Sequence, residues 1–440
     1  MTQPISTQSG STRASFASRR LDVHGEHLVT TVLPSGGAYA WEVSGEVGSP
    51  LAEAVRGASV PASPPALAVV LGRDYEPAAD AALLDAVARA RSCGLPVALL
   101  HEGAGGVSLL RAAALEVRGL RFGSVEVAAR TPRALSAAPA AAAASLESAA
   151  LGGPGQRREV LVDARGRTLT GQWRPVELPA STPPSTAGRA AAPVLVTGGL
   201  GGLGLRAAAA VAAAAGVRVL LLDSRGPGEL TAGEQRLLSR LRAGARAGAD
   251  VLTADVTDPR AVARALDRAG GTAPSVLVHC AGSVAGGLVA DARPEDLARL
   301  RAAKSQGLRT VLAHLDRGAL RCLVAFGSVT SRRVHPGMGG YALANEVLRR
   351  TALRVAGGLP GCAVVVAEWS LWSGAGEAHR MGVVKDAARQ GMPAVPLRPG
   401  MDALLRMLRR PAGPEHAAAL VVTGAGDRGF PEPGAAAPGR

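Results

Sequence analysis

A chain of 440 residues is long enough for two or three globular units. Hydrophobic residues make up 47% of the chain but aromatic residues only 2%, so the core must consist mainly of Ala, Val and Leu. Such side chains suit parallel strands between Ala-rich helices. The net charge of +14 comes from arginines dispersed along the chain without interleaved aromatics, which argues against nucleic-acid binding and leaves either solvated arginines or a basic surface for an acidic carrier protein. The four cysteines are widely spaced, so they form neither the paired spacing of a zinc site nor the framework of a disulfide-rich secreted protein. No apolar run reaches the ~18 residues of a membrane span, which excludes a membrane protein. We therefore expect a cytoplasmic location.

The N-terminal part of the chain predicts a small α/β unit. Residues 1–20 are rich in Ser, Thr and Arg and predict a disordered tail. Within residues 21–177, apolar runs at Leu67–Leu71 and Pro96–Leu100 flank a helical pattern at Ala78–Arg91. This unit contains no glycine fingerprint, so it is expected to be structural and to bind no cofactor.

Two low-complexity stretches interrupt the chain, at residues 131–155 and 178–193. Both are rich in Ala, Pro, Ser and Gly, and we interpret both as surface linkers. The second would join the N-terminal unit to the rest of the chain.

The segment 194–425 has a regular alternation of strands and helices. It starts with a strand at Val194–Thr197, a glycine-rich turn, an Ala-rich helix to about Ala215 and a strand at Val217–Leu222. Further strands are predicted at Val251–Ala254, Ser275–His279, Leu323–Phe326 and Ala363–Ala367. The alternation predicts a doubly wound parallel sheet of the Rossmann type, with ligands at the carboxyl ends of the strands. Residues 426–440 predict a second disordered tail.

The turn after the first of these strands is a candidate cofactor site. Glycines there would let the backbone approach a pyrophosphate, and the start of the following helix favours its negative charge. The turn consists of Thr197, Gly198, Gly199, Leu200, Gly201, Gly202, Leu203 and Gly204.

The spacing TGxxxGxG in this turn resembles that of short-chain dehydrogenases/reductases. Two further segments are similar to sequences of that family. Asp255-Val256 resembles its adenine contact, and the segment with His279, Ala281 and Gly282 resembles the turn beneath the nicotinamide ribose.

Four residues are candidates for catalysis. Reduction of a ketone needs a hydride and a proton for the developing alkoxide, and Tyr341 could supply the proton if the ammonium of Lys304 lies near. Ser328 could donate to the same oxygen, and Asn345 could order a water that resupplies the proton. Tyr341 and Asn345 are four residues apart and share one face of a predicted helix. The structural alternative makes Tyr341 a half-buried core aromatic.

The placement of Lys304 and Asn345 distinguishes this chain within the superfamily. Ordinary members carry YxxxK, whereas this chain has YxxxN and its lysine 24 residues before Ser328. This exchange resembles ketoreductase domains of polyketide synthases and polyunsaturated fatty acid synthases. The resemblance implies a tetrad of Lys304, Ser328, Tyr341 and Asn345, and an N-terminal structural unit like a truncated Rossmann fold. Trp369-Ser370-Leu371-Trp372 resembles the WGPW of the fatty acid and iterative branch, although Trp369 could equally serve packing.

The resemblance also implies a cofactor and leaves the product configuration open. The family places Ser-Arg after the second strand for the 2′-phosphate of NADPH, and here Asp223-Ser224-Arg225 occupies that place. NADPH is therefore expected, with NADH possible because Asp223 could accept from ribose hydroxyls. Two fingerprints of product configuration are not met, because Val284-Ala285-Gly286 replaces an LDD triplet and Arg333 replaces a tryptophan.

The function implied is reduction of a β-ketoacyl chain on an acyl carrier protein in polyketide or fatty acid biosynthesis. The carrier, with its phosphopantetheine-linked substrate, would be supplied in trans by a synthase, since these residues carry no carrier, ketosynthase or acyltransferase signature. Its arm is expected to enter near Trp372–Pro393, whose glycines would let the segment act as a lid. The alternatives are a reductase of free small ketones and a non-catalytic Rossmann scaffold.

Overall fold

The computed structural model describes residues 21–33, 36–151, 159–179, 192–380, 382–413, 416–427 and 430. The predicted tail at 1–20 and most of the predicted linker at 178–193 and of the tail at 426–440 lie outside the described residues. Among the residues described, no helix is long and apolar enough to cross a bilayer.

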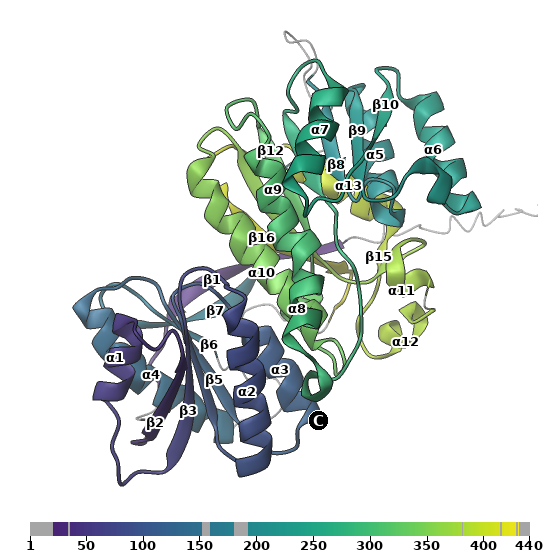
Figure 1. The fold of residues 1–440 in the computed structure, drawn as a ribbon. Coiled ribbons are helices and arrows are strands. Elements are labelled where there is room, and N and C mark those ends of the chain that lie inside the picture. Colours follow the sequence, from purple (N-terminus) through teal and green to yellow (C-terminus); the bar gives the residue numbers. More distant parts are fainter. Residues whose placement is uncertain are drawn as a thin grey trace, which may run out of the picture.

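Seven parallel strands form the C-terminal half of the sheet, in the order β10-β9-β8-β11-β12-β13-β16 (Figure 1). This order reverses between β8 and β11, as in a doubly wound sheet, and it confirms the predicted fold class. The last strand was not predicted from the sequence. The strands are β8 (Val194–Thr197), β9 (Val219–Asp223), β10 (Ala249–Thr253), β11 (Val276–His279), β12 (Cys322–Ser328), β13 (Ala363–Trp369) and β16 (Ala418–Gly424).

Helices cover both faces of this half of the sheet. One face packs against α5 (Gly202–Ala215), α6 (Ala232–Gly244) and α13 (Leu397–Met407). The other packs against α7 (Pro259–Ala269), α9 (Gly307–Ala313) and α10 (Gly339–Val355), with α8 (Pro294–Arg301) leading into α9 through the π-helical turn η3 (Ala302–Gln306). Short 3₁₀ turns are η1 (Pro227–Glu229), η2 (Val289–Asp291), η4 (Val329–Ser331) and η5 (Ala356–Gly358).

The N-terminal half continues the same sheet. Its strands β2 to β6 are parallel and follow one another in chain order, so they offer no reversal at which a ligand crevice would form. The strands are β1 (Leu21–Thr30), β2 (Ala40–Gly45), β3 (Pro65–Leu71), β4 (Val97–His101), β5 (Phe122–Val127), β6 (Glu159–Val162) and β7 (Thr168–Pro175). The helices are α1 (Pro50–Gly57), α2 (Ala78–Cys93), α3 (Val107–Glu116) and α4 (Pro132–Leu151).

Strand β1 joins the two halves into one 14-stranded sheet. It pairs antiparallel with β16 on one side and with β7 on the other. In Figure 1 it lies, in purple, between the blue N-terminal half and the green C-terminal half. Backbone hydrogen bonds therefore connect the halves directly.

The interpretation of residues 131–155 as a surface linker is wrong for residues 132–151, and residues 152–155 lie outside the described residues. Residues 132–151 form α4, which packs on β4, β5 and β6 and buries Ala134, Ala138, Ala142 and Leu146. Alanine has the highest helix propensity, and its small side chain lets a helix approach a sheet closely. A run of alanines with the composition of a linker therefore forms a buried helix when a sheet lies beside it.

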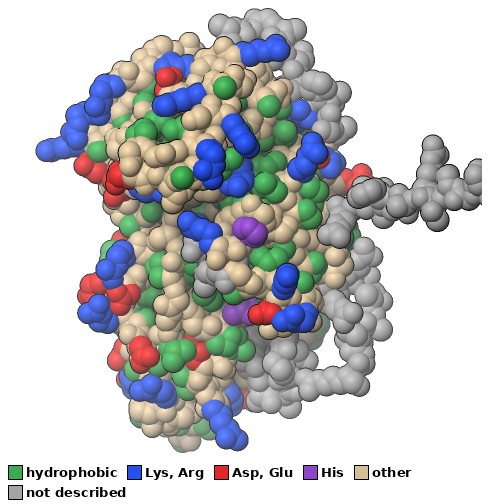
Figure 2. Space-filling view, turned by 90° about the vertical axis from the view of Figure 1, so that its right-hand side faces the viewer, with side chains coloured by type: hydrophobic (Ala, Val, Ile, Leu, Met, Phe, Trp, Pro, Cys, Tyr) green, Lys and Arg blue, Asp and Glu red, His purple; other side chains and the backbone are tan. Residues whose placement is uncertain are grey.

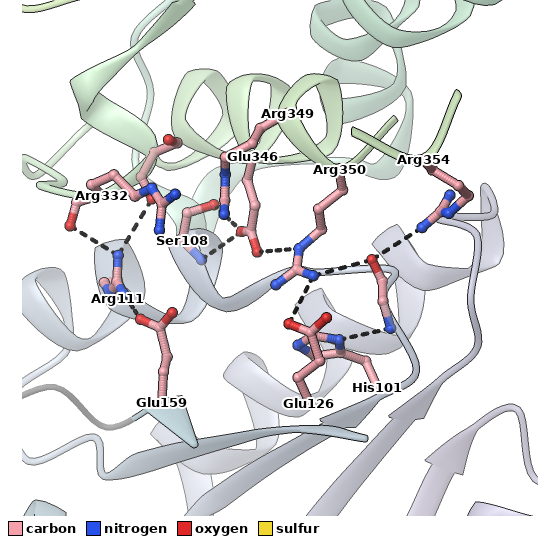
Figure 3. A network of polar contacts seen from close by, with 12 residues as sticks. His101, Ser108, Arg111, Glu126, Glu159, Arg332, Glu346, Arg349, Arg350 and Arg354 are labelled. Atoms are coloured by element: carbon pink, nitrogen blue, oxygen red, sulfur yellow. Dashed lines mark hydrogen bonds and ion pairs between the residues drawn. The ribbon is translucent and has the colours of Figure 1, made fainter. Parts of the chain in front are cut away.

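Helix α10 carries a buried charge network that reaches into the N-terminal half (Figure 3). The Glu346 carboxylate accepts hydrogen bonds from the backbone N–H of Ser108 at 2.9 Å and from its hydroxyl at 2.6 Å. The Arg350 guanidinium joins Glu346 at 3.3 Å to Glu126 of β5 at 3.0 Å. Burial would raise the pKa of Glu346, but the charges of Arg350 and Arg349 and the Ser108 hydrogen bonds lower it to about 2. The carboxylate is thus fully buried and ionised.

We expect Glu346→Ala to lower the free energy of unfolding by about 3–5 kcal/mol, because it leaves Arg350 buried with only one of its two acidic partners and leaves Ser108 unpaired. Urea denaturation would measure the change. The exposed Glu53 of α1 supplies the control, since Glu53→Ala should change the stability by less than about 0.5 kcal/mol. Equal stabilities of the two variants would contradict this account of the network.

Candidate active site

The residues predicted to bind the cofactor lie at the carboxyl ends of the parallel strands. Thr197 ends β8, Asp223 ends β9 and His279 ends β11, while Ser328 ends β12. The reversal of strand order falls between β8 and β11, whose last residues, Thr197 and His279, are paired in register. A crevice for a ligand is expected at this point of a doubly wound sheet.

The glycine-rich turn packs too closely for side chains at several positions. Gly198 has φ +62°, and a Cβ there would lie 2.9 Å from Ala281 of the turn after β11. A Cβ on Gly204 would lie 2.1 Å from the Gly198 carbonyl oxygen, and one on Gly199 would lie 2.7 Å from that of Val196. These three glycines are required by the fold itself. Leu200 is fully buried beneath the turn.

The next glycines of the turn are different. A Cβ on Gly202, at the start of α5, would meet nothing closer than 3.8 Å, and on Gly201 only the Gly198 oxygen at 3.2 Å. Packing therefore does not explain the glycine at 202, whereas a ligand that contacts the backbone at the helix start would. Leu203 is partly buried against the core beside it. The turn fits the pyrophosphate of a dinucleotide.

Asp223 is engaged by the turn and by its own neighbour. One carboxylate oxygen accepts from the Leu200 N–H at 3.0 Å, and the other accepts from the Arg225 N–H at 3.1 Å. The Arg225 guanidinium lies 3.5 Å from Asp223 and 3.3 Å from Glu234. The charge of Asp223 is therefore partly offset, and Ser224 between the two residues is exposed.

A hydrogen-bonded chain links the glycine turn to Lys304. Thr197 Oγ1 lies 2.8 Å from His279 Nδ1, and His279 Nε2 lies 2.8 Å from the Lys304 carbonyl oxygen. Burial lowers the pKa of His279 to about 4, so the ring is neutral. Because a carbonyl oxygen only accepts, Nε2 carries the proton and Nδ1 accepts from Thr197.

Lys304 lies on the π-helical turn η3 and its side chain points into the protein. It is 5% exposed, donates to the Phe326 carbonyl oxygen at 3.2 Å, and its Nζ lies 5.9 Å from the centroid of the Tyr341 ring. A Cβ on Gly282 would lie 2.9 Å from the Lys304 side chain, so glycine at 282 makes room for the lysine. Burial lowers the pKa of Lys304 to about 8.

Tyr341, Ser328 and Asn345 meet on one side of α10. Tyr341 is half-buried, and burial raises its pKa, while hydrogen bonding with Ser328 and Asn345 partly offsets this rise. The Asn345 amide donates to the Tyr341 carbonyl oxygen at 2.8 Å, and its fully buried Oδ1 has no protein partner. A buried oxygen of this kind calls for a water or a ligand. All four candidate catalytic residues thus lie together.

Two other candidates have structural contacts of their own. Asp255, after β10, is exposed, and its carboxylate accepts from the N–H and the hydroxyl of Thr257 at 2.8 Å each. Val256 is buried against Gly307 of α9, where a Cβ would lie 2.5 Å from the valine. Their predicted contact with adenine remains a prediction.

The predicted lid at 372–393 contains the short elements β14 (Trp372–Ser373), α11 (Gly376–Arg380) and α12 (Val384–Arg389), and β15 (Val395–Pro396), which pairs with β14, follows it. Trp369 and Trp372 are both buried, with ring centroids 4.7 Å apart, and Trp372 packs against Gly400 of α13. The two tryptophans therefore attach the start of this segment to the protein core. Its role as a lid remains a prediction.

The sequence analysis did not identify two buried residues, Arg301 and Glu368, whose contacts support the segments that carry Lys304 and Ser328. Arg301, one turn before Lys304, pairs with the buried Asp80 of α2 and lies 4.6 Å from the centroid of the Tyr75 ring. Glu368 of β13 is fully buried and accepts a hydrogen bond at 2.6 Å from the hydroxyl of Ser331, the last residue of η4. No local sequence signal indicates these contacts, since the partners are distant in the chain.

Comparison with known proteins identifies the C-terminal half. The family model of the KR domain matches residues 192–374, which contain the glycine turn and all four candidate catalytic residues. These residues are therefore similar to the KR domain family. Curated relatives include polyketide synthase GfsB of Streptomyces halstedii, 33% identical over 219 residues, and the pikromycin polyketide synthase component PikAIII of Streptomyces venezuelae, 37% identical over 186 residues. The alignments cover 48% and 42% of this chain but only 4% and 12% of those proteins.

Solved structures extend the similarity of fold beyond the KR domain match to nearly the whole chain. An A1-type ketoreductase matches with a TM-score of 0.73 at 22% identity, over 93% of this chain and 94% of that one. A ketoreductase from the first module of phoslactomycin biosynthesis in Streptomyces sp. HK803 matches with a TM-score of 0.71 at 24% identity, over 94% and 98%. At this identity the likeness concerns the fold, and it includes the N-terminal half.

Proposed function

We propose that this chain is a ketoreductase that reduces a β-ketoacyl chain on an acyl carrier protein to the β-hydroxyacyl product, with NADPH as reductant, in the cytoplasm. The observation that carries the proposal is the meeting of Lys304, Ser328, Tyr341 and Asn345 beside the glycine turn. The KR domain match and the ketoreductase titles of the structural relatives support the same reaction class.

A nicotinamide cofactor bound at the glycine turn would supply the hydride for this reaction. Tyr341 donates the proton, because its raised pKa keeps the phenol protonated at neutral pH. Ser328 stabilises the charge that develops on the carbonyl oxygen. Lys304, ionised below about pH 8, adds a positive charge beside the tyrosine. The unpaired Oδ1 of Asn345 holds a water that returns a proton to the site.

NADPH is favoured over NADH by the surroundings of Asp223. The two hydrogen bonds and the neighbouring guanidinium reduce the repulsion that this carboxylate would exert on a 2′-phosphate. Arg225 is within reach of a phosphate placed there, although it shares its charge with Glu234.

An acyl carrier protein is the proposed partner, supplied in trans by a synthase. Two of the curated relatives are named as a polyketide synthase and as a polyketide synthase component, which supports a carrier-bound substrate of this class. Figure 2 shows one face of the molecule, on which Lys and Arg side chains lie dispersed among hydrophobic and neutral ones. That distribution gives no support to a nucleic-acid groove.

Two alternatives are kept. A reductase of free small ketones would use the same four residues without a carrier. A non-catalytic Rossmann scaffold is disfavoured by the grouping of the four side chains and by the buried, ionisable Lys304, for which a scaffold has no need.

The decisive experiment compares wild type with Tyr341→Phe on a β-ketoacyl thioester, free and tethered to a separate carrier protein. We expect Tyr341→Phe to lower kcat by about 10²–10⁴-fold, since the proton donor is lost. Tyr39→Phe, the same change in the N-terminal half, should retain the wild-type rate. Full activity of Tyr341→Phe would refute the assignment, and equal kcat/KM for the free and tethered substrates would favour the free-ketone alternative.

The pH dependence of reduction should report on Lys304. Its ammonium is fully present well below pH 8 and is lost as the pH rises, so kcat/KM should fall above about pH 8 while the phenol of Tyr341 stays protonated. Steady-state rates between pH 6.5 and 9.5 at saturating cofactor would show the decline. In Lys304→Met the residual rate should be flat over this range, and an unchanged profile in that variant would assign the decline to another group.

Arg225 provides the test of cofactor choice. Wild type should show the higher kcat/KM with NADPH, and Arg225→Ala should lose about 10–100-fold with NADPH but change little with NADH, because only NADPH offers the phosphate for a charge-assisted hydrogen bond. The exposed Arg240 of α6, changed to alanine, is the control. A wild type that prefers NADH would overturn the choice.

A further inference from the structure

Two loops of the C-terminal half flank the proposed catalytic residues. The first, residues 283–288, continues from Gly282, the glycine that makes room for Lys304. The second, residues 332–338, lies between Ser328 and Tyr341. Both loops are thus next to proposed catalytic residues in the chain, and we expect a ketone bound at Ser328 and Tyr341 to lie near them. The first is exposed throughout, and it presents Val284 and Leu288 to solvent at 42% and 47% exposure.

Glu116, the last residue of α3 in the N-terminal half, holds both loops. Its Oε2 accepts from the backbone N–H of Val289 at 2.6 Å, immediately after the first loop. Its Oε1 accepts from the N–H of Gly337 at 2.8 Å, within the second. The loops also bond each other, since the Gly287 N–H donates to the Gly337 carbonyl oxygen at 2.8 Å. These three hydrogen bonds form one junction that joins the Glu116 carboxylate of α3 to both loops.

The contacts around this junction are tight. Val289 is 2% exposed, and a Cβ on Gly339, at the start of α10, would lie 2.5 Å from Val289 and 2.9 Å from Ala112 of α3. Helix α3, η2 and the start of α10 are therefore in direct contact. This close packing restricts movement of Glu116 relative to residues 339–340, which precede Tyr341.

The end of a helix is an unfavourable position for the Glu116 carboxylate unless hydrogen-bond donors stabilise its charge. A negative charge on the last residue of a helix lies against the negative end of the helix dipole. Two backbone N–H donors offset this cost with charge-assisted hydrogen bonds. Through Glu116 the N-terminal half, which has no glycine fingerprint, thereby contacts both loops.

We propose that Glu116 is a positioning residue that fixes loops 283–288 and 332–338 and thereby sets how the ketone is presented to Tyr341. This proposal rests on the proposed ketoreductase function. It concerns the orientation of the substrate, and it leaves the binding of the cofactor and the proton transfer to the residues already described.

The test uses the full chain with Glu116→Ala and Glu116→Gln, and with Glu53→Ala of α1 as the control. Hydrogen exchange is measured first, without substrate. The amides of Val289 and Gly337 should exchange on the order of tenfold faster in Glu116→Ala, because each loses its acceptor. In Glu116→Gln one oxygen remains, so one of the two amides should stay closer to its wild-type rate. Unchanged exchange at both amides in Glu116→Ala would overturn the proposal.

Kinetics with a prochiral β-ketoester then separate positioning from general damage. Glu116→Ala should raise the KM of the ketone about tenfold and move the ratio of the two alcohol enantiomers toward equality, while the Kd for NADPH stays within about twofold of wild type. Faster amide exchange with an unchanged KM and enantiomer ratio would overturn the substrate role. An equal weakening of NADPH binding would also overturn the substrate role, because it would indicate general destabilisation. Glu116→Gln provides a second measurement if the alanine variant folds poorly. An inactive wild type would refute the proposed function instead, whereas an active wild type with unaltered variants refutes only the role of Glu116.

Discussion

The structure depends on how helix α10 is held. One side of this helix presents Tyr341 and Asn345 to the proposed active site, and the next residue, Glu346, is buried in the N-terminal half against Ser108. Successive helical residues point about 100° apart, so a rotation of α10 that moved the tyrosine would also withdraw Glu346 from its donors. Because an ionised carboxylate without partners is costly to bury, the helix has one stable orientation. The N-terminal half thus fixes the geometry of a site to which it contributes no proposed catalytic residue.

The sequence alone was sufficient where the signal was local. The glycine turn is read within eight residues, and its flanking strand and helix, β8 and α5, follow from a short apolar run and an alanine-rich stretch. Tyr341 and Asn345 lie one helical turn apart, so their common face could be predicted. Lys304 and Ser328 were found through the resemblance to ketoreductases, because the distance from either to Tyr341 in space is not encoded by any local pattern.

The interactions that connect the halves could not be predicted in this way. Ser108 and Glu346 are 238 residues apart, and Glu116 meets its amide partners 173 and 221 residues further along the chain. The strands β1 and β16, which join the halves by antiparallel pairing, were missed for the same reason. Helix α4 was misread because its composition is that of a linker, and only the neighbouring sheet makes burial of its alanines favourable.

The exchange of lysine and asparagine has a physical consequence for the KR domain. A lysine on α10 would be positioned by that helix, whereas Lys304 lies on a π-helical turn whose backbone is held through the neutral ring of His279. The same ring accepts from Thr197 at the end of β8. A protonated His279 would have two donors and could not accept from Thr197, so the pKa of about 4 preserves this chain of hydrogen bonds across the working pH range. The position of the lysine is therefore tied to the strand that precedes the glycine turn, and the cofactor side and the proton-donating side of the site share one rigid connection.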